Sequence, residues 1–147
     1  MRKFIAKFKE LTVQKKLLYL GFIVLIVFVL YSIYWCIFNY VHFLRYDNAT
    51  VDGYTYTVFD NKFPNFNGNM VVEDEDGNSA IVWVKPFKGA WYGVEIRLYE
   101  GDSEVYAMVK VDGELQAKDG EKQYIVEEEY EMFNSLVSHA KSYFKLD

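Results

Sequence analysis

The sequence predicts an α+β protein in which an N-terminal single transmembrane helix is followed by an antiparallel β-meander packed on one C-terminal amphipathic helix. Three observations predict it. A long uncharged apolar run lies near the N-terminus, turn residues then recur between short alternating segments, and near the C-terminus the apolar spacing changes to three and four residues. The 147 residues therefore divide into a lead (1–16), an anchor (17–44) and one domain (45–147).

The apolar run, Leu17–Phe38, contains no charged residue. As a helix it would be roughly 33 Å long, enough to cross a bilayer core of about 30 Å. The run is longer than the apolar core of a cleaved signal peptide, and no small-residue cleavage site follows it. Bulky residues precede the single cysteine, Cys36, which argues against a lipoprotein cleavage site. We therefore expect an uncleaved signal-anchor whose helix runs to about Leu44.

Charge is distributed unevenly along the chain. Residues 1–16 carry six cations against Glu10, a net charge of +5, whereas residues 45–147 carry ten cations against twenty anions, a net charge of −10. The positive-inside rule then predicts a single-pass protein of the cell membrane with a cytoplasmic N-terminus and an extracellular C-terminal domain. The acidic domain should repel nucleic acid, so the expected partners are the bilayer around the helix and a protein.

The domain begins with segments typical of β-strands. Strands are expected at Tyr54–Phe59, Met70–Glu73, Ser79–Phe87, Trp91–Glu100 and Glu104–Asp112. Glycine-bearing turns such as Asp76-Gly77-Asn78 separate them, and Phe63–Asn69, which contains a proline and a glycine, is expected to be a loop. The segments together describe a β-meander.

A helix is expected from about Val126 to the C-terminus. Its apolar stripe is formed by Val126, Tyr130, Phe133, Leu136, Val137, Ala140 and Phe144. Glutamates fill its first turns and lysines its last, which favours the helix dipole at both ends.

Residue parity separates two faces of the sheet. Aliphatic side chains alternate along the last two strands and need the cover that the amphipathic helix can supply. The opposite face mixes aromatic and charged residues, and we expect it to be the partner-binding surface. Its predicted members are Trp83, Lys85, Glu95, Arg97, Tyr99, Tyr106, Met108 and Lys110. For the aromatic turn Lys85–Gly93, a role in capping the core is favoured over a binding lip.

The sequence predicts no catalytic, cofactor or metal site, and no small-molecule substrate. Asp74, Asp76 and Asn78 have the spacing that opens a calcium loop, but the positions that need glycine and glutamate hold Ser79 and Lys85. A solvated hairpin turn is the favoured interpretation. His139 is expected to be an exposed helical residue without the neighbours that a nucleophile–base pair needs.

The order of parts resembles the TipC family of membrane-anchored immunity proteins of Gram-positive bacteria. The likeness lies in the anchor Leu17–Phe38, the strand pair Tyr92–Glu114 (YGVEIRLYEGDSEVYAMVKVDGE) and the terminal helix through Phe144. The resemblance implies an immunity protein whose exposed sheet face binds and neutralises a type VII-secreted toxin outside the cytoplasmic membrane, without turnover. The alternative is an accessory single-pass subunit of a bacterial secretion, conjugation or cell-envelope complex.

Overall fold

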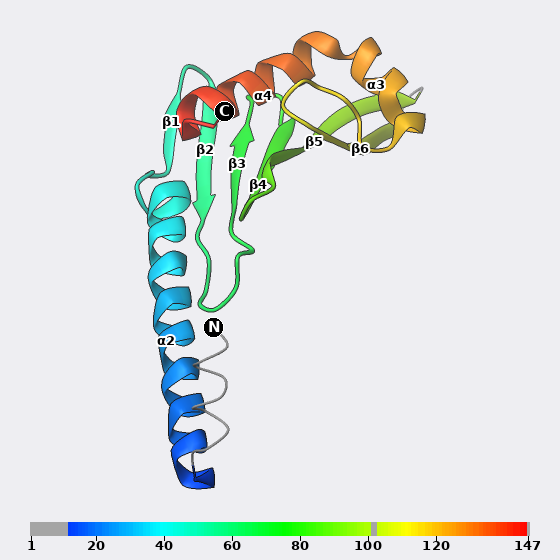
Figure 1. The fold of residues 1–147 in the computed structure, drawn as a ribbon. Helices are drawn as coiled ribbons and strands as arrows, with labels where there is room; N and C mark the ends of the chain where they lie inside the picture. The colour runs from blue at the N-terminus through cyan, green and yellow to red at the C-terminus, as the bar shows by residue number, and fades with distance from the viewer. Residues whose placement is uncertain (1–11, 101–102, 147) are drawn as a thin grey trace. The chain divides into compact units, whose positions relative to one another are not determined.

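A computed structural model describes residues 12–100 and 103–146, with side chains described for 12–97 and 106–146. The predicted basic lead, residues 1–16, lies mostly outside this part of the chain. The chain divides into two compact units between Ile37 and Phe38, which are treated separately here. Figure 1 shows the course of the chain.

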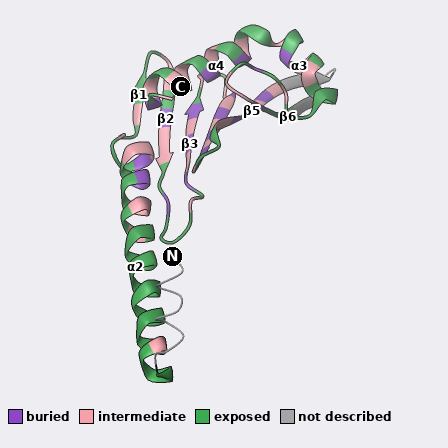
Figure 2. Cartoon of the chain, viewed as in Figure 1, coloured by how far each residue is buried: buried purple, intermediate pink, exposed green. Residues whose placement is uncertain are grey.

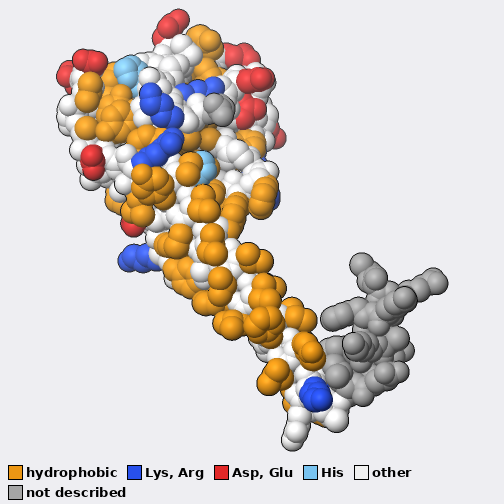
Figure 3. Space-filling view, turned by 60° about the vertical axis from the view of Figure 1, so that its left-hand side comes forward, with side chains coloured by type: hydrophobic (Ala, Val, Ile, Leu, Met, Phe, Trp, Pro, Cys, Tyr) orange, Lys and Arg blue, Asp and Glu red, His pale blue; other side chains and the backbone are white. Residues whose placement is uncertain are grey.

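The first unit is the long apolar helix. Helix α2 (Val13–Asn39) continues into a π-helical stretch, Tyr40–Leu44, so the helix ends where the sequence predicts. Its apolar side chains between residues 13 and 33 are exposed, and Figure 3 shows them along the helix. By length and composition this helix can cross a membrane, as a single-pass anchor or a signal sequence would.

The second unit is built on one antiparallel sheet of six strands in sequential order. Its strands are β1 (Ala49–Val51), β2 (Tyr54–Phe59), β3 (Asn69–Glu73), β4 (Ser79–Lys85), β5 (Gly89–Glu100) and β6 (Ser103–Val111). The predicted meander is confirmed, and β1 is an addition to it. Asp52 and Gly53, with φ of 51° and 81°, form the tight turn between β1 and β2, because a two-residue hairpin turn of this hand needs positive φ at both positions.

Helices cover one face of the sheet. Helix α4 (Tyr130–Phe144) packs across β3, β4 and β5, and the shorter α3 (Gln123–Glu128) precedes it. The hydrophobic core lies between the sheet and the helices, where Figure 2 shows the buried segments in purple. It is formed by Val72, Val82, Val94, Val109 and Val111 of the sheet with Phe133, Leu136, Val137, Ala140 and Phe144 of α4.

The helical segment differs from the prediction in one respect. It is interrupted at Glu129, whose φ of −108° and ψ of 30° are not helical, and so α3 and α4 are separate. The interruption changes the direction of the apolar stripe, and Tyr130, expected within it, is 50% exposed. Hydrogen bonds from Glu129 N–H to the Ile125 carbonyl and from Phe133 N–H to the Glu129 carbonyl continue on both sides of the break.

Tyrosines join α4 to the start of the sheet. The hydroxyl of Tyr54 lies 2.6 Å from Ser135 Oγ, that of Tyr56 lies 3.0 Å from His139 Nδ1, and that of Tyr143 donates to the Asp47 carbonyl at 2.9 Å. The His139 ring also stacks on Tyr54, with centroids 3.8 Å apart. The expectation of an exposed histidine is therefore wrong, because β2 brings two tyrosines to a helix position that looks polar in sequence.

The end of the apolar helix belongs to this unit. Phe38, Asn39 and Phe43 are buried against the loop between β2 and β3. Asn61 N–H donates to Asn39 Oδ1 at 3.1 Å, and Gly68 N–H donates in turn to Asn61 Oδ1. The Phe38 ring meets Phe66 edge-on, with centroids 5.0 Å apart. The loop is thereby ordered by the helix end on which it packs.

Candidate partner-binding face

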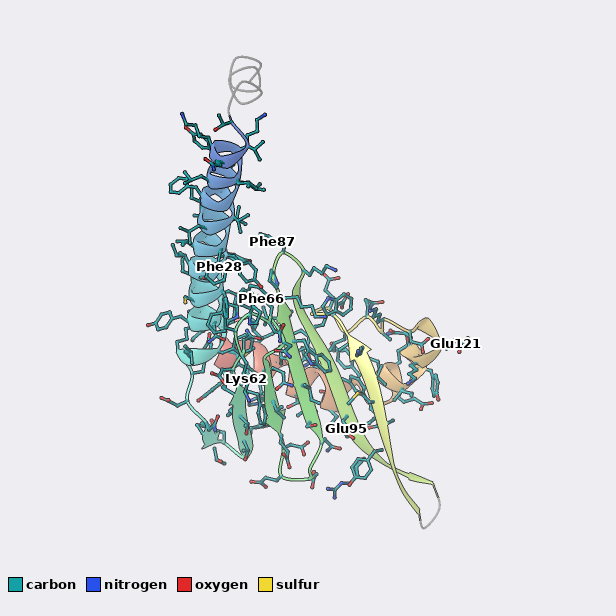
Figure 4. The ribbon with its side chains drawn as sticks, turned by 90° about the horizontal axis from the view of Figure 1, so that it is seen from below. Phe28, Lys62, Phe66, Phe87, Glu95 and Glu121 are labelled. Carbon is teal, nitrogen blue, oxygen red and sulfur yellow. The ribbon has the colours of Figure 1, made fainter. Side chains whose placement is uncertain are left out.

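The face of the sheet opposite α4 collects the predicted residues. Figure 4 looks onto this face, with α4 behind the strands and Phe87 at the β4–β5 turn. Registers Trp83↔Trp91, Glu95↔Met108 and Arg97↔Tyr106 place their side chains in adjacent rows of one surface. The described members are partly buried or exposed, while their neighbours in sequence, such as Val82 and Ile96, are buried on the other side. The predicted parity of the two faces is confirmed.

One predicted member is placed by its backbone alone. Tyr99 pairs with Glu104 at the end of the β5–β6 ladder, but its side chain lies outside the described residues. The binding role of all eight residues stays a prediction.

Two cations on this face lie over aromatic rings of other strands: Arg97 of β5 over Tyr106 of β6, and Lys110 of β6 over Trp83 of β4. The Arg97 guanidinium is 5.8 Å from the centroid of Tyr106, and Lys110 Nζ is 5.1 Å from that of Trp83. Such contacts hold a flexible cationic side chain in place and contribute about 0.5–1 kcal/mol at exposed sites. The geometry therefore presents positive charge on a partly apolar surface.

Gly93 makes one of these contacts possible. It lies opposite Lys110 in β6 and Ile81 in β4, and the indole of Trp83 covers it. A β-carbon at Gly93 would come within 2.6 Å of two carbons of that ring. Glycine in a strand interior often marks such a close approach. Without a side chain here, the indole can lie against the backbone and within reach of the Lys110 ammonium.

A hollow of about 460 Å³ opens on this face near the β4–β5 turn. It is lined by Trp83, Lys85, Lys88, Trp91, Lys110 and Lys118. Lys118 Nζ lies 5.6 Å from the centroid of Trp91, so both tryptophans carry a lysine ammonium over the ring. We call these six residues the lysine–tryptophan hollow.

Sequence reasoning missed three members of this hollow. Trp91 shares the parity of Glu95 and could have been added on that signal. Lys118 could not, because a bridge between Val111 and Ala117 folds its segment back along β6, and Lys118 N–H donates to the Lys110 carbonyl at 2.8 Å. Lys88 lies just outside the strands, in the β4–β5 turn.

The aromatic turn is divided between the two interpretations. Tyr92 is fully buried in the core, as the favoured interpretation predicts, and burial raises the pKa of its hydroxyl to about 12. Phe87 is 95% exposed, so the core interpretation is wrong for this residue. Trp91 lies on the open face.

The opposite end of the face is acidic. A hollow of about 530 Å³ near the β3–β4 turn is lined by Glu73, Glu75, Asp76, Gly77, Asn78, Arg97 and Met132. Because Met132 belongs to α4, this hollow lies at the end of the sheet and reaches from the open face to the helix side. Trp91 and Arg97, at the two ends, are separated by about 20 Å along β5 at the usual rise per residue. The face is therefore polarised, with lysines at the β4–β5 turn and carboxylates at the β3–β4 turn.

The acidic turn itself has the structure of a hydrogen-bonded hairpin connection. The Asp74 carboxylate accepts hydrogen bonds from Asp76 N–H at 3.0 Å and from Asn78 N–H at 2.8 Å, while its other oxygen accepts from Asn78 Nδ2 at 2.9 Å. Asn78 Oδ1 accepts from Arg97 N–H at 2.9 Å and ties the turn to β5. Asp74 thus organises the turn, which agrees with the favoured interpretation of a hairpin.

Comparison of the chain with protein-family models, with curated proteins and with solved structures finds no match in any of the three.

Proposed function

We propose that this chain is a membrane-anchored immunity protein. Its helix holds the domain at the outer side of the cytoplasmic membrane, with the N-terminus inside, and the open face binds and neutralises a secreted toxin of the type VII kind. One observation carries the proposal: α4 covers one face of the sheet, whereas the described residues of the other face present aromatic and charged side chains. Tyr, Trp and Arg are enriched at the energetic centres of protein interfaces.

The mechanism would be occlusion at a fixed stoichiometry. A standard interface takes about 800 Å² from each partner, and an open face of several strands offers a surface of that order. Opposite charges at its two ends would select one orientation of the partner, because complementary potentials contribute to specificity and to the rate of association. The C-terminal domain would therefore block the toxin without chemistry of its own.

A protection assay tests this proposal. Cells exposed to a type VII-secreted toxin would be scored for survival with the full-length chain, with Arg97→Glu and with Tyr106→Ala, and binding of the toxin to each chain would be measured. We expect the wild-type chain to protect and each variant to weaken toxin binding by about tenfold or more, as for residues near an interface centre. Arg97→Glu reverses a charge on the open face. Tyr106→Ala removes an aromatic ring that is 54% exposed there.

Matched controls lie away from the open face. Lys145→Glu reverses a charge at the end of α4, and Tyr124→Ala removes an exposed ring from α3; both should protect like the wild type. Failure of the wild-type chain to protect, or equal losses in the controls, would contradict the proposal. Unfolding of both Arg97→Glu and Tyr106→Ala would contradict the assignment of the open face.

A further inference from the structure

The lysines of the domain are concentrated at one place. Five of its ten cations line the lysine–tryptophan hollow or the adjoining hollow of about 620 Å³, which is formed by Met108, Lys110, Lys118, Asp119 and Lys122. Asp119 is the one acidic residue among the described residues that line them. In a domain with a net charge of −10, this is a local reversal of sign.

Three of the five ammonium groups, those of Lys110, Lys118 and Lys122, are held in position by contacts within the domain. Lys110 and Lys118 are joined by a backbone hydrogen bond, and each ammonium lies over its own indole ring. Lys122 Nζ donates to the Met108 carbonyl at 3.3 Å. Within the described part of the chain, no carboxylate neutralises Lys85, Lys88, Lys110 or Lys118 by an ion pair. The contacts of Lys110, Lys118 and Lys122 order their side chains in advance, which lowers the entropic cost of binding an anion.

The geometry points to a carboxylate-rich segment of a protein partner as the ligand of the lysine–tryptophan hollow. This inference rests on the proposed function for its protein partner and names the chemistry that the partner presents. Carboxylates would bind the lysines by charge-assisted hydrogen bonds, and an apolar or aromatic side chain between them would contact the edges of Trp83 and Trp91.

The negative charge of the rest of the domain favours a ligand small enough to contact the hollow alone. Charges interact within a screening length of about 8 Å at physiological ionic strength. An anionic bilayer or a nucleic acid duplex is much wider than the hollow, and it would bring its negative charge against the carboxylates of the rest of the domain as well. A single acidic segment can enter the hollow without doing so. A protein segment is therefore the ligand that the charge distribution favours.

The test uses a short fluorescent peptide that is rich in glutamate and has one central tyrosine. Its binding to the full-length chain in zwitterionic nanodiscs would be followed by fluorescence anisotropy. We expect saturable binding that weakens as salt is added, and no binding of a peptide in which glutamine replaces glutamate. Lys110→Gln combined with Lys118→Gln should weaken binding by about tenfold, which corresponds to about 1.4 kcal/mol.

The matched control is Lys62→Gln combined with Lys145→Gln, which removes the same charge outside the hollow and should change binding less than about twofold, as expected for distant screened charges. Equal losses in the two double variants, or no loss in the first, would overturn the inference. Near-ultraviolet circular dichroism would show whether each variant is folded.

The other arm of the test uses vesicles of phosphatidylglycerol and phosphatidylcholine. If the nanodiscs float with these vesicles, and if flotation is lost in Lys110→Gln/Lys118→Gln, the hollow would be assigned to lipid instead.

The two proposals can fail separately. Peptide binding at the hollow without protection from the toxin would refute the immunity function and keep the site. Protection and toxin binding that survive unchanged in Lys110→Gln/Lys118→Gln would refute the site and keep the function.

Discussion

At the scale of single residues, Tyr92 carries a cost that a substitution can remove. Its side chain is fully buried, and its hydroxyl has no hydrogen-bond partner among the described residues. An unsatisfied buried polar group costs about 1–3 kcal/mol. We therefore expect Tyr92→Phe to raise the free energy of unfolding by about 1 kcal/mol, measured by urea titration of the full chain in micelles with near-ultraviolet circular dichroism.

Tyr56→Phe is the matched control, because the Tyr56 hydroxyl is hydrogen-bonded to His139 Nδ1 at 3.0 Å and its loss should lower stability.

The pH dependence of the free energy of unfolding gives a second measurement for Tyr92. Burial raises the pKa of Tyr92 from 10 to about 12, so the unfolded chain loses this proton first and stability falls as the pH rises between those values. Tyr92→Phe should reduce that fall. A lower stability of Tyr92→Phe at neutral pH would contradict the expectation.

Gly93 connects a single residue to the proposed site. Gly93→Ala would force the Trp83 indole away from its position, because a β-carbon would lie 2.6 Å from the ring. We expect weaker binding of the acidic peptide together with a loss of stability of about 1–3 kcal/mol, typical of overpacking. Gly120→Ala, which would meet nothing within 4 Å, should change neither quantity. Unchanged peptide binding in Gly93→Ala would show that the indole position does not matter for the hollow.

At the scale of elements, the junction between the end of α2 and the β2–β3 loop depends on two asparagines. Asn39→Ala would leave the buried Asn61 N–H without its acceptor, which should cost about 1–3 kcal/mol. Thermal unfolding of the full chain would measure the loss, and hydrogen exchange at Asn61 and Gly68 would locate it. Asn67→Ala, at an exposed position of the same loop, should have little effect. Equal effects of both variants would contradict the relay through Asn61.

The strands and helices also show which parts of the fold can be predicted from the sequence. Strand parity and glycine turns are local signals, and they placed seven described members of the open face together. The misses depend on distant parts of the chain. Strand β1 is too short to show a period and is held by Asn48 and Thr50, through Asn48 Oδ1 with Val58 N–H at 2.9 Å and Thr50 Oγ1 with Thr55 Oγ1 at 3.3 Å. His139 is partly buried only because β2 lies beside α4.

At the scale of the whole molecule, the three parts of the chain differ in their net charge. A basic lead, an uncharged apolar run and an acidic domain follow one another. The positive-inside rule predicts that the basic end stays in the cytoplasm. The domain begins at Phe38, the last residue of the apolar run, and the end of α2 is part of its core. The proposed binding face therefore belongs to a domain without a long linker to its anchor.

Orientation can be tested with single cysteines in a Cys36→Ser background. Ser142 is exposed on α4, and Val13 is exposed at the start of α2. In the proposed orientation the acidic domain is translocated and the six cations stay inside. We therefore expect a membrane-impermeant maleimide to label Ser142→Cys in intact cells, and to label Val13→Cys only after permeabilisation. An epitope tag on the N-terminus should remain on the labelled Ser142→Cys chain, since an anchor stays uncleaved whereas a signal sequence is removed. Labelling of Val13→Cys alone in intact cells would reverse the orientation, and loss of the tag would replace the anchor by a signal sequence. Either result would remove the extracellular tether on which the proposed neutralisation of a toxin at the membrane depends.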